Sequence, residues 1–206
     1  MDMIKKISAI VVVASVLLAG KALADSTFGY GSAGTGQVSA TAQAKVTVNV
    51  PKLILLRVGT AGATIDTLTF SASPTINTLP GATLGADGSG KAATWDGAVP
   101  LFADAAGQDL NALVWTNSAG GGELTCSTTA NTQFTSAFGL TSANVAVSSS
   151  GTLGHPGTST ACGSTVSVAK NTLLAGTWTY SIAGSALANA AAGTHTQTTT
   201  YTATTL

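Results

Sequence analysis

The chain has 206 residues, of which 8% are charged and 45% are hydrophobic, and its formal net charge at pH 7 is zero. Such sparse charge provides no basic surface of the kind that nucleic-acid binding needs, so no nucleic-acid partner is expected. The length is sufficient for one sandwich or barrel domain with a hydrophobic core.

Residues 1–24 have the pattern of a cleaved signal peptide. Two lysines precede an apolar stretch over 7–20 that is short for a membrane span, and an Ala-Leu-Ala cleavage signal ends the segment. Cleavage is expected between Ala24 and Asp25, with a retained N-terminal anchor as the alternative. The mature chain then keeps five basic and seven acidic residues, a net charge near −2. Its neutral, hydroxyl-rich surface suits either packing against copies of itself or a small secreted domain.

The mature chain begins with a Gly-rich segment over 25–36, which is expected to be flexible. Residues 37–50 then alternate strictly between polar and apolar side chains, the pattern of a strand with one buried and one wet face. The apolar members are Val38, Ala40, Ala42, Ala44, Val46, Val48 and Val50. Such a strand is either the first strand of a sandwich or an arm that a neighbouring molecule uses. At about 3.3 Å per residue the fourteen residues extend over roughly 46 Å, so 37–43 could serve as the arm and 44–50 as a core strand.

The remaining elements are short strands separated by turn signals. Strands are expected over 53–58, 63–71, 111–116, 123–129, 144–148, 165–169, 176–182 and 194–204, a hairpin over 91–102 with its turn at Asp96-Gly97, loops over 74–90 and 149–160, and one helical turn over 186–192. No long segment has helical periodicity, which predicts an all-β sandwich. We therefore expect a signal peptide at 1–24, a flexible segment at 25–36 and a single β-sandwich domain at 37–206.

The two cysteines, Cys126 and Cys162, are predicted to form a disulfide because the chain is expected to be exported. Closing a loop of about 37 residues stabilises a fold by roughly 3–4 kcal/mol in the chain-entropy model. Reduced thiols or metal ligands are the alternative, but neither cysteine has a second cysteine or a pair of histidines nearby.

No catalytic residue, metal site or cofactor is predicted, and the chain is not expected to be an enzyme. Residues 29–34 match G-x-G-x-x-G, but they follow the leader rather than a strand and no helix is expected after them, so a flexible linker is the interpretation. His155 and His195 are interpreted as surface or hydrogen-bonded polar residues, because a catalytic assignment requires a carboxylate and a nucleophile in reach.

Two further groups of residues have a functional and a structural interpretation. Asp104 and Asp109 could contribute to a calcium site, but the ligand spacing of an EF-hand is absent. Four aromatic residues could form a sugar-stacking face, although in a sandwich they are more often core residues. They are Trp95, Trp115, Trp178 and Tyr180.

Taken together, these features resemble the bacterial fimbrial subunits and the spore-coat-U-like secreted proteins. The resemblance rests on the leader that ends at Ala24, the alternating segment 37–50, the pair Cys126 and Cys162, and the Thr-rich ending over 192–204. The chain departs from the family pattern at His195, where an aromatic residue is more usual, and in having its first cysteine late in the domain. The resemblance implies an Ig-like antiparallel β-sandwich with Greek-key-type connections.

The resemblance also implies a function. The chain would be an exported structural subunit of a fimbria, pilus or similar cell-surface polymer that assembles by β-strand addition, with the apolar residues of 37–50 filling pockets in a neighbour. Its partners would be copies of itself or related subunits, with a periplasmic chaperone and an outer-membrane assembly protein during transit through the periplasm. A monomeric secreted or envelope module that binds carbohydrate or mediates adhesion is the alternative, and a hydrolase is a third.

Overall fold

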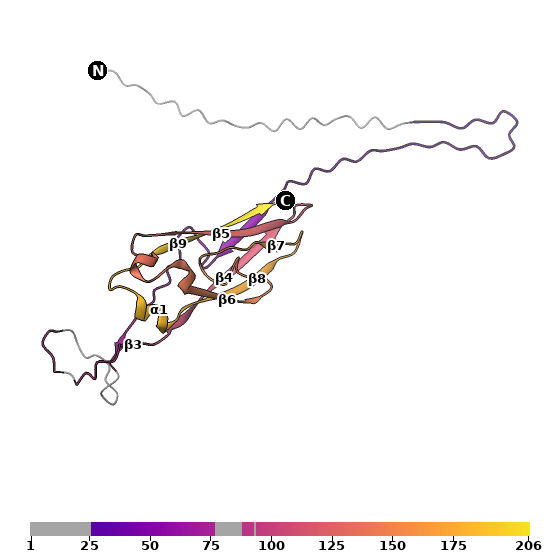
Figure 1. Ribbon diagram of the computed structural model, residues 1–206. Helices are drawn as coiled ribbons and strands as arrows, with labels where there is room; N and C mark the ends of the chain where they lie inside the picture. The colour runs from indigo at the N-terminus through magenta and orange to yellow at the C-terminus, as the bar shows by residue number, and fades with distance from the viewer. Residues whose placement is uncertain (1–25, 77–87, 93) are drawn as a thin grey trace, which may run out of the picture. The chain divides into compact units, whose positions relative to one another are not determined.

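The computed structural model describes residues 26–76, 88–92 and 94–206, and the chain divides after Val50 into two units (Figure 1). The expected signal peptide and its cleavage between Ala24 and Asp25 lie outside the described residues. Residues 51–206 contain all the strands that the structure describes, and residues 37–50 belong to the N-terminal unit. The predicted domain boundary at residue 37 stays a prediction.

Residues 51–206 form two antiparallel sheets and one short strand pair. The four-stranded sheet contains, in spatial order, β1 (Ile54–Val58), β4 (Ala105–Thr116), β8 (Leu174–Ile182) and β6 (Val145–Gly151). The three-stranded sheet contains β7 (Val166–Val168), β5 (Gly122–Ala130) and β9 (Gln197–Thr205). β2 (Pro74–Thr75) pairs with β3 (Leu101–Phe102), and the helical turns are η1 (Ser136–Phe138), η2 (Ser142–Asn144) and α1 (Gly184–Asn189).

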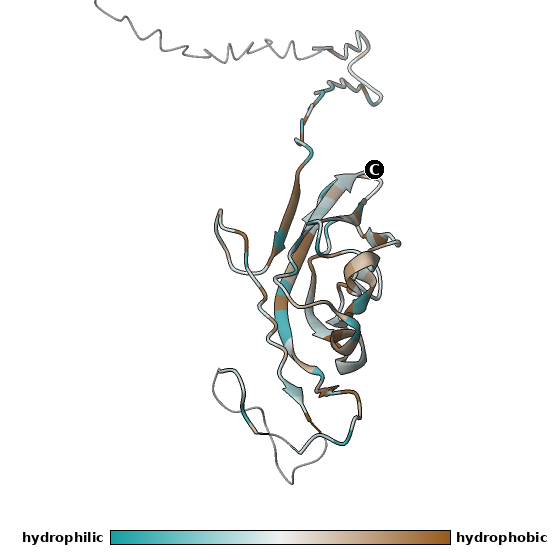
Figure 2. Ribbon diagram, turned by 60° about the vertical axis from the view of Figure 1, so that its left-hand side comes forward, coloured by the Kyte–Doolittle hydropathy of each residue, from teal (hydrophilic) through white to brown (hydrophobic). Residues whose placement is uncertain are grey.

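From β4 to β9 each successive strand lies in the opposite sheet, the connectivity typical of Greek-key sandwiches. The inner faces of the sheets meet in one core, with Val114 and Trp178 from the four-stranded sheet packed against Leu124 and Val168 from the three-stranded sheet. Along much of β4 and β8 the side chains alternate between more buried and less buried. Figure 2 shows that hydropathy also changes along the ribbon of the strands. The predicted all-β antiparallel sandwich is therefore confirmed.

The predicted disulfide is also confirmed. It joins Cys126 on β5 to Cys162 in the connection between β6 and β7, and the Cα atoms are 5.7 Å apart, within the usual range for a bridge. Cys162 has φ = 66°, a left-handed conformation that is uncommon for a residue other than glycine. The bridge fixes the loop that contains His155 against β5.

Three predicted elements differ from the observed structure. No residue from 26 to 50 lies in a strand. Residues 63–71 run beside β4 without joining its ladder, because the side-chain amide of Gln108 takes the place of a backbone partner by accepting from Thr69 N and donating to Thr69 O. The described residues of 91–100 contain no strand, so the turn at Asp96-Gly97 lacks the flanking ladder that a hairpin requires.

Candidate functional site

The sandwich has an open edge beside its last strand. β9 pairs with β5 along one edge, and no strand that the structure describes pairs with its other edge. A groove of about 910 Å³ lies between β9 and residues 65–70. The position of this groove, between an edge strand of one sheet and a segment that borders the other, is where an additional strand could join β9.

The groove is lined mainly by hydrophobic side chains. Leu110 and Ile182 come from the four-stranded sheet, Leu68 and Phe70 from the segment beside β4, and Phe134 and Leu187 from connections. Leu68 and Phe70 pack against the core although their backbone is not part of a sheet. An extended peptide in this groove could place alternate side chains in apolar surroundings while its backbone pairs with β9.

The other end of β9 is closed. There β1 lies against β9, the Lys52 ammonium donates to the Leu206 carbonyl oxygen over 3.4 Å, and Ser118 Oγ donates to the same oxygen. The groove therefore extends along the first part of β9, from Gln197 to Tyr201, and not along the whole strand.

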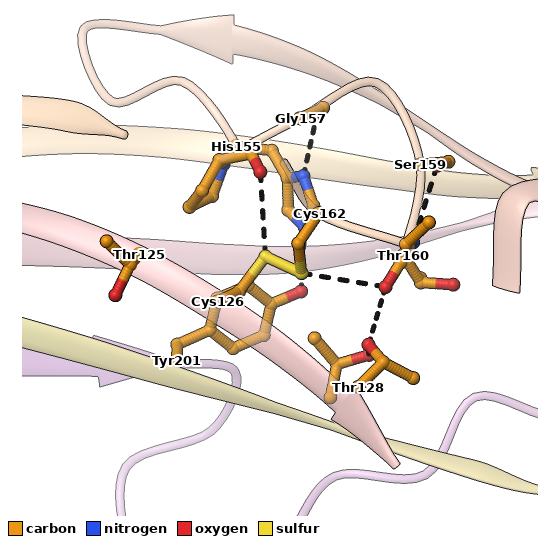
Figure 3. The surroundings of a disulfide bond; sticks show 12 residues. Thr125, Cys126, Thr128, His155, Gly157, Ser159, Thr160, Cys162 and Tyr201 are labelled. Carbon is orange, nitrogen blue, oxygen red and sulfur yellow. Dashed lines mark hydrogen bonds between the residues drawn. A yellow bond between two sulfur atoms is a disulfide. The ribbon is translucent and has the colours of Figure 1, made fainter. Parts of the chain in front are cut away.

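A buried chain of hydrogen bonds fixes the inner side of β9. His155 Nε2 is 2.8 Å from Tyr201 Oη, which is 2.8 Å from Tyr180 Oη, and His155 Nδ1 is 2.8 Å from the Gly157 carbonyl oxygen. Figure 3 shows His155 and Tyr201 beside the disulfide. A carbonyl oxygen can only accept, so Nδ1 carries the proton and the neutral ring accepts from Tyr201 at Nε2. The His155 ring also packs edge-on against Trp178, with ring centroids 5.0 Å apart.

Burial controls the protonation of this cluster. It lowers the pKa of His155 below its ordinary value, partly offset by the hydrogen bond to Gly157. Burial also raises the pKa of Tyr180, and burial together with the neighbouring Tyr180 raises the pKa of Tyr201. These shifts favour the uncharged form of all three groups at neutral pH, and the hydrogen bonds of the cluster join β9 to the loop that contains His155.

The predicted donor segment has no strand partner among the described residues of its own unit. All described residues of its unit, 26–50, are exposed, and its valines have exposed fractions between 55% at Val38 and 83% at Val46. The only side-chain hydrogen bonds among these residues join Thr27 to Thr41: Thr41 N donates to Thr27 Oγ1 over 2.8 Å, and Thr27 Oγ1 donates to Thr41 O over 2.6 Å. Residues 42–50 thus present their alternating face without a partner from their own unit.

The other candidate residues lie apart and bond to different partners in the part of the chain that the structure describes. His195 lies between the carbonyl oxygens of Gln133 and Ala191, and neither histidine bonds to a carboxylate. Asp104 accepts from Gly184 N, whereas Asp109 accepts from Thr179 Oγ1. Within the described ranges no three His, Cys, Asp or Glu side chains converge as metal ligands.

The aromatic residues divide between the core and the surface. Trp178 and Tyr180 are buried in the core, as expected for a sandwich. Trp95 is 61% exposed, and Trp115 lies on the outer face of β4 outside the core. Residues 29–34 are exposed and lead into no helix, so the dinucleotide-binding motif lacks its structural context.

Sequence reasoning missed the groove and the hydrogen-bonded cluster. The groove depends on which edge of β9 stays unpaired, and the cluster joins residues 46 positions apart. One signal was available: Cys126 lies opposite Tyr201 in the register of β5 and β9, so a loop bonded to Cys126 must pass close to Tyr201.

Comparisons with known proteins identify no relative. No protein-family model, curated protein or solved structure matches the chain. Among the helices that the structure describes, none has the length and apolar character that crossing a membrane requires.

Proposed function

We propose that this chain is an exported structural subunit that assembles with its copies by β-strand addition. Residues 37–50 of one subunit would enter the groove beside β9 of the next. The observation that supports the proposal is the combination of two incomplete parts in the described residues. One is an exposed amphipathic segment with no strand partner in its own unit, and the other is an apolar groove beside β9, whose second edge pairs with no described strand.

The dimensions of the two parts are compatible. The groove follows β9 from Gln197 to Tyr201, about 17 Å at roughly 3.3 Å per residue. The donor segment is longer, roughly 46 Å when extended, so only part of it is needed in the groove. Its central side chains are alanines and its last ones are valines, so the same segment offers two sizes of apolar side chain to one groove.

Assembly by this route also implies partners in transit. An apolar groove beside a free strand edge is prone to uncontrolled pairing. We propose that a periplasmic chaperone covers the groove before assembly, and that an outer-membrane assembly protein exchanges it for the donor segment of another subunit. The assembled product would lie at the cell surface as a fimbria or similar polymer.

The experiment compares two substitutions on opposite faces of the donor segment. Val46→Asp places a carboxylate on the apolar face, whereas the matched Thr47→Asp places it on the polar face. The purified mature protein is examined by size-exclusion chromatography and negative-stain microscopy. Polymers should form with wild-type and Thr47→Asp protein and be lost with Val46→Asp, and a wild-type protein that stays monomeric at high concentration would overturn the proposal.

A further inference from the structure

A second surface, which borders the groove and shares Asp66, Thr67, Leu68 and Leu110 with it, has the composition of a ligand site. It lies at the end of β1, where the chain separates from β4. The last backbone hydrogen bond between the two strands joins Gly59 N to the Asn111 carbonyl oxygen over 2.7 Å. At Gly59 the chain adopts φ = 82° and turns away, and Thr60 N donates to the Asp66 carboxylate to close the loop. The result is a hollow of about 390 Å³.

The hollow is lined by polar side chains of several kinds. They include Arg57, Thr60, Asp66, Thr67, Asp109 and Asn111. Thr179 Oγ1 donates to Asp109 Oδ1 over 2.6 Å, and Thr177 Oγ1 donates to Asn111 Oδ1 over 3.0 Å. These two bonds orient both β4 side chains from the neighbouring strand β8, and they leave the second carboxylate oxygen of Asp109 and the amide NH₂ group of Asn111 for a ligand.

The charges of the hollow decide which ligand class fits. The carboxylates of Asp66 and Asp109 outnumber the Arg57 guanidinium and repel an anion such as phosphate or sulfate. A divalent cation is also disfavoured, because it needs several converging oxygens and the guanidinium repels it. A hydroxyl group both donates and accepts, so a neutral polyol satisfies guanidinium, amide and carboxylate together. The hollow therefore favours an uncharged, hydroxyl-rich ligand.

An apolar strip continues the hollow along the same strand. Asn111, Leu113 and Trp115 are alternate residues on the outer face of β4, and Trp115 lies about 13 Å from Asn111 at roughly 3.3 Å per residue. Leu55, which is 55% exposed, lies opposite Trp115 on β1. Neither Leu113 nor Trp115 belongs to the core, so the indole ring serves no packing role inside the sandwich.

We infer that this corner of the four-stranded sheet binds a neutral oligosaccharide. Arg57, Asp109 and Asn111 hydrogen-bond the hydroxyl groups of one sugar unit, and Trp115 stacks on the apolar face of another. Aromatic rings with a few oriented polar groups are the usual composition of sites for small organic ligands. The distance from Asn111 to Trp115 requires a chain of sugar units rather than a single ring.

The test titrates the mature protein with cellotriose, chitotriose, maltotriose and mannotriose and follows tryptophan fluorescence and calorimetric heat. At least one sugar should bind, and Trp115→Ala and Arg57→Ala should each weaken its binding at least about tenfold. The matched control is Trp95→Ala, which removes an exposed tryptophan outside the hollow and should leave the affinity unchanged.

The inference is wrong if none of the four sugars binds at about 10 mM, or if binding survives both Trp115→Ala and Arg57→Ala. Using two variants keeps the test decisive should one of them fold poorly. A protein that lacks residues 37–50 should bind the sugar as tightly as the complete mature chain, which separates this site from strand addition.

Discussion

Two segments of this chain are both expected to be strands and differ in structure. Residues 37–50 alternate strictly between polar and apolar side chains and residues 197–205 are mainly threonine, yet only the second segment forms a strand. β9 pairs with β5 over its whole length and packs the half-buried Tyr201 against the core, whereas the valines of the first segment are exposed. A period of two thus encodes the capacity to form a strand, and an available partner edge decides whether the strand forms.

The largest expected effect comes from deleting each segment in turn. Deletion of residues 197–205 removes the only neighbour of β5 on that side and should abolish cooperative unfolding. Deletion of 37–50 should change the free energy of unfolding of the monomer by less than about 0.5 kcal/mol, because these residues are exposed. Urea denaturation followed by circular dichroism measures both, and a large loss of stability on deleting 37–50 would show that this segment belongs to its own sandwich.

The disulfide should give the next largest effect, because it ties the β6–β7 connection to β5, the partner of β9. The double variant Cys126→Ser, Cys162→Ser opens a loop with a sequence separation of 36. The free energy of unfolding should fall by roughly 3–4 kcal/mol, which lowers the melting temperature by about 10 °C. Calorimetry of the oxidised wild type and the variant checks this, and equal melting temperatures would count against a stabilising bridge.

Removing one hydrogen-bonding group from the cluster of His155, Tyr180 and Tyr201 should lower the free energy of unfolding by less than loss of the disulfide. Tyr201→Phe removes the hydroxyl group that donates to His155 Nε2. Two buried polar atoms, His155 Nε2 and Tyr180 Oη, then each lose a hydrogen-bond partner. Such a loss costs about 1–3 kcal/mol of stability. The matched control is Tyr30→Phe at a 78% exposed position, which should be neutral in the same denaturation experiment. Equal stability of the two variants would show that the cluster does not hold β9.

The smallest expected effect is the contribution of His155 to the pH dependence of folding stability. Burial lowers its pKa in the folded state, so below about pH 6.5 the unfolded chain binds more protons and folding stability falls. One group contributes at most about 1.4 kcal/mol per pH unit. The groups that face its ring are Tyr180, Tyr201 and Trp178, none of them acidic.

Denaturation at pH 7, 6 and 5 measures this dependence. His155→Gln should lose this part of the pH dependence, and His195→Gln should retain it. If the stability of wild-type protein and His155→Gln protein falls equally on acidification, His155 is not the group responsible.

Local patterns predicted most of the sandwich, because its strands are short, alternating and separated by glycine-containing turns. β1, β5 and β8 lie where their alternation or apolar run placed them. Residues 63–71 alternate equally well, but Gln108 occupies the position of a backbone partner there, and a side chain 39 residues away leaves no trace in the local pattern.

The candidate sites were less predictable for a related reason. The apolar groove depends on the absence of a partner beside β9, and the sugar site depends on cross-strand neighbours such as Asp109 and Thr179. Trp115 illustrates the difficulty: the sequence Leu-Val-Trp suggests a buried strand, and only the register shows that Val114 points inward while its neighbours point outward.

Hydrogen exchange along β9 tests strand addition most directly. In the monomer, alternate amides of an antiparallel edge strand point away from its partner and should exchange rapidly, since only β5 pairs with β9. Assembled protein is exposed to deuterated water, dissociated and read residue by residue. The account predicts that the outward amides between Gln197 and Tyr201 become protected on assembly. Assembled protein in which these amides exchange as fast as in the monomer would contradict it.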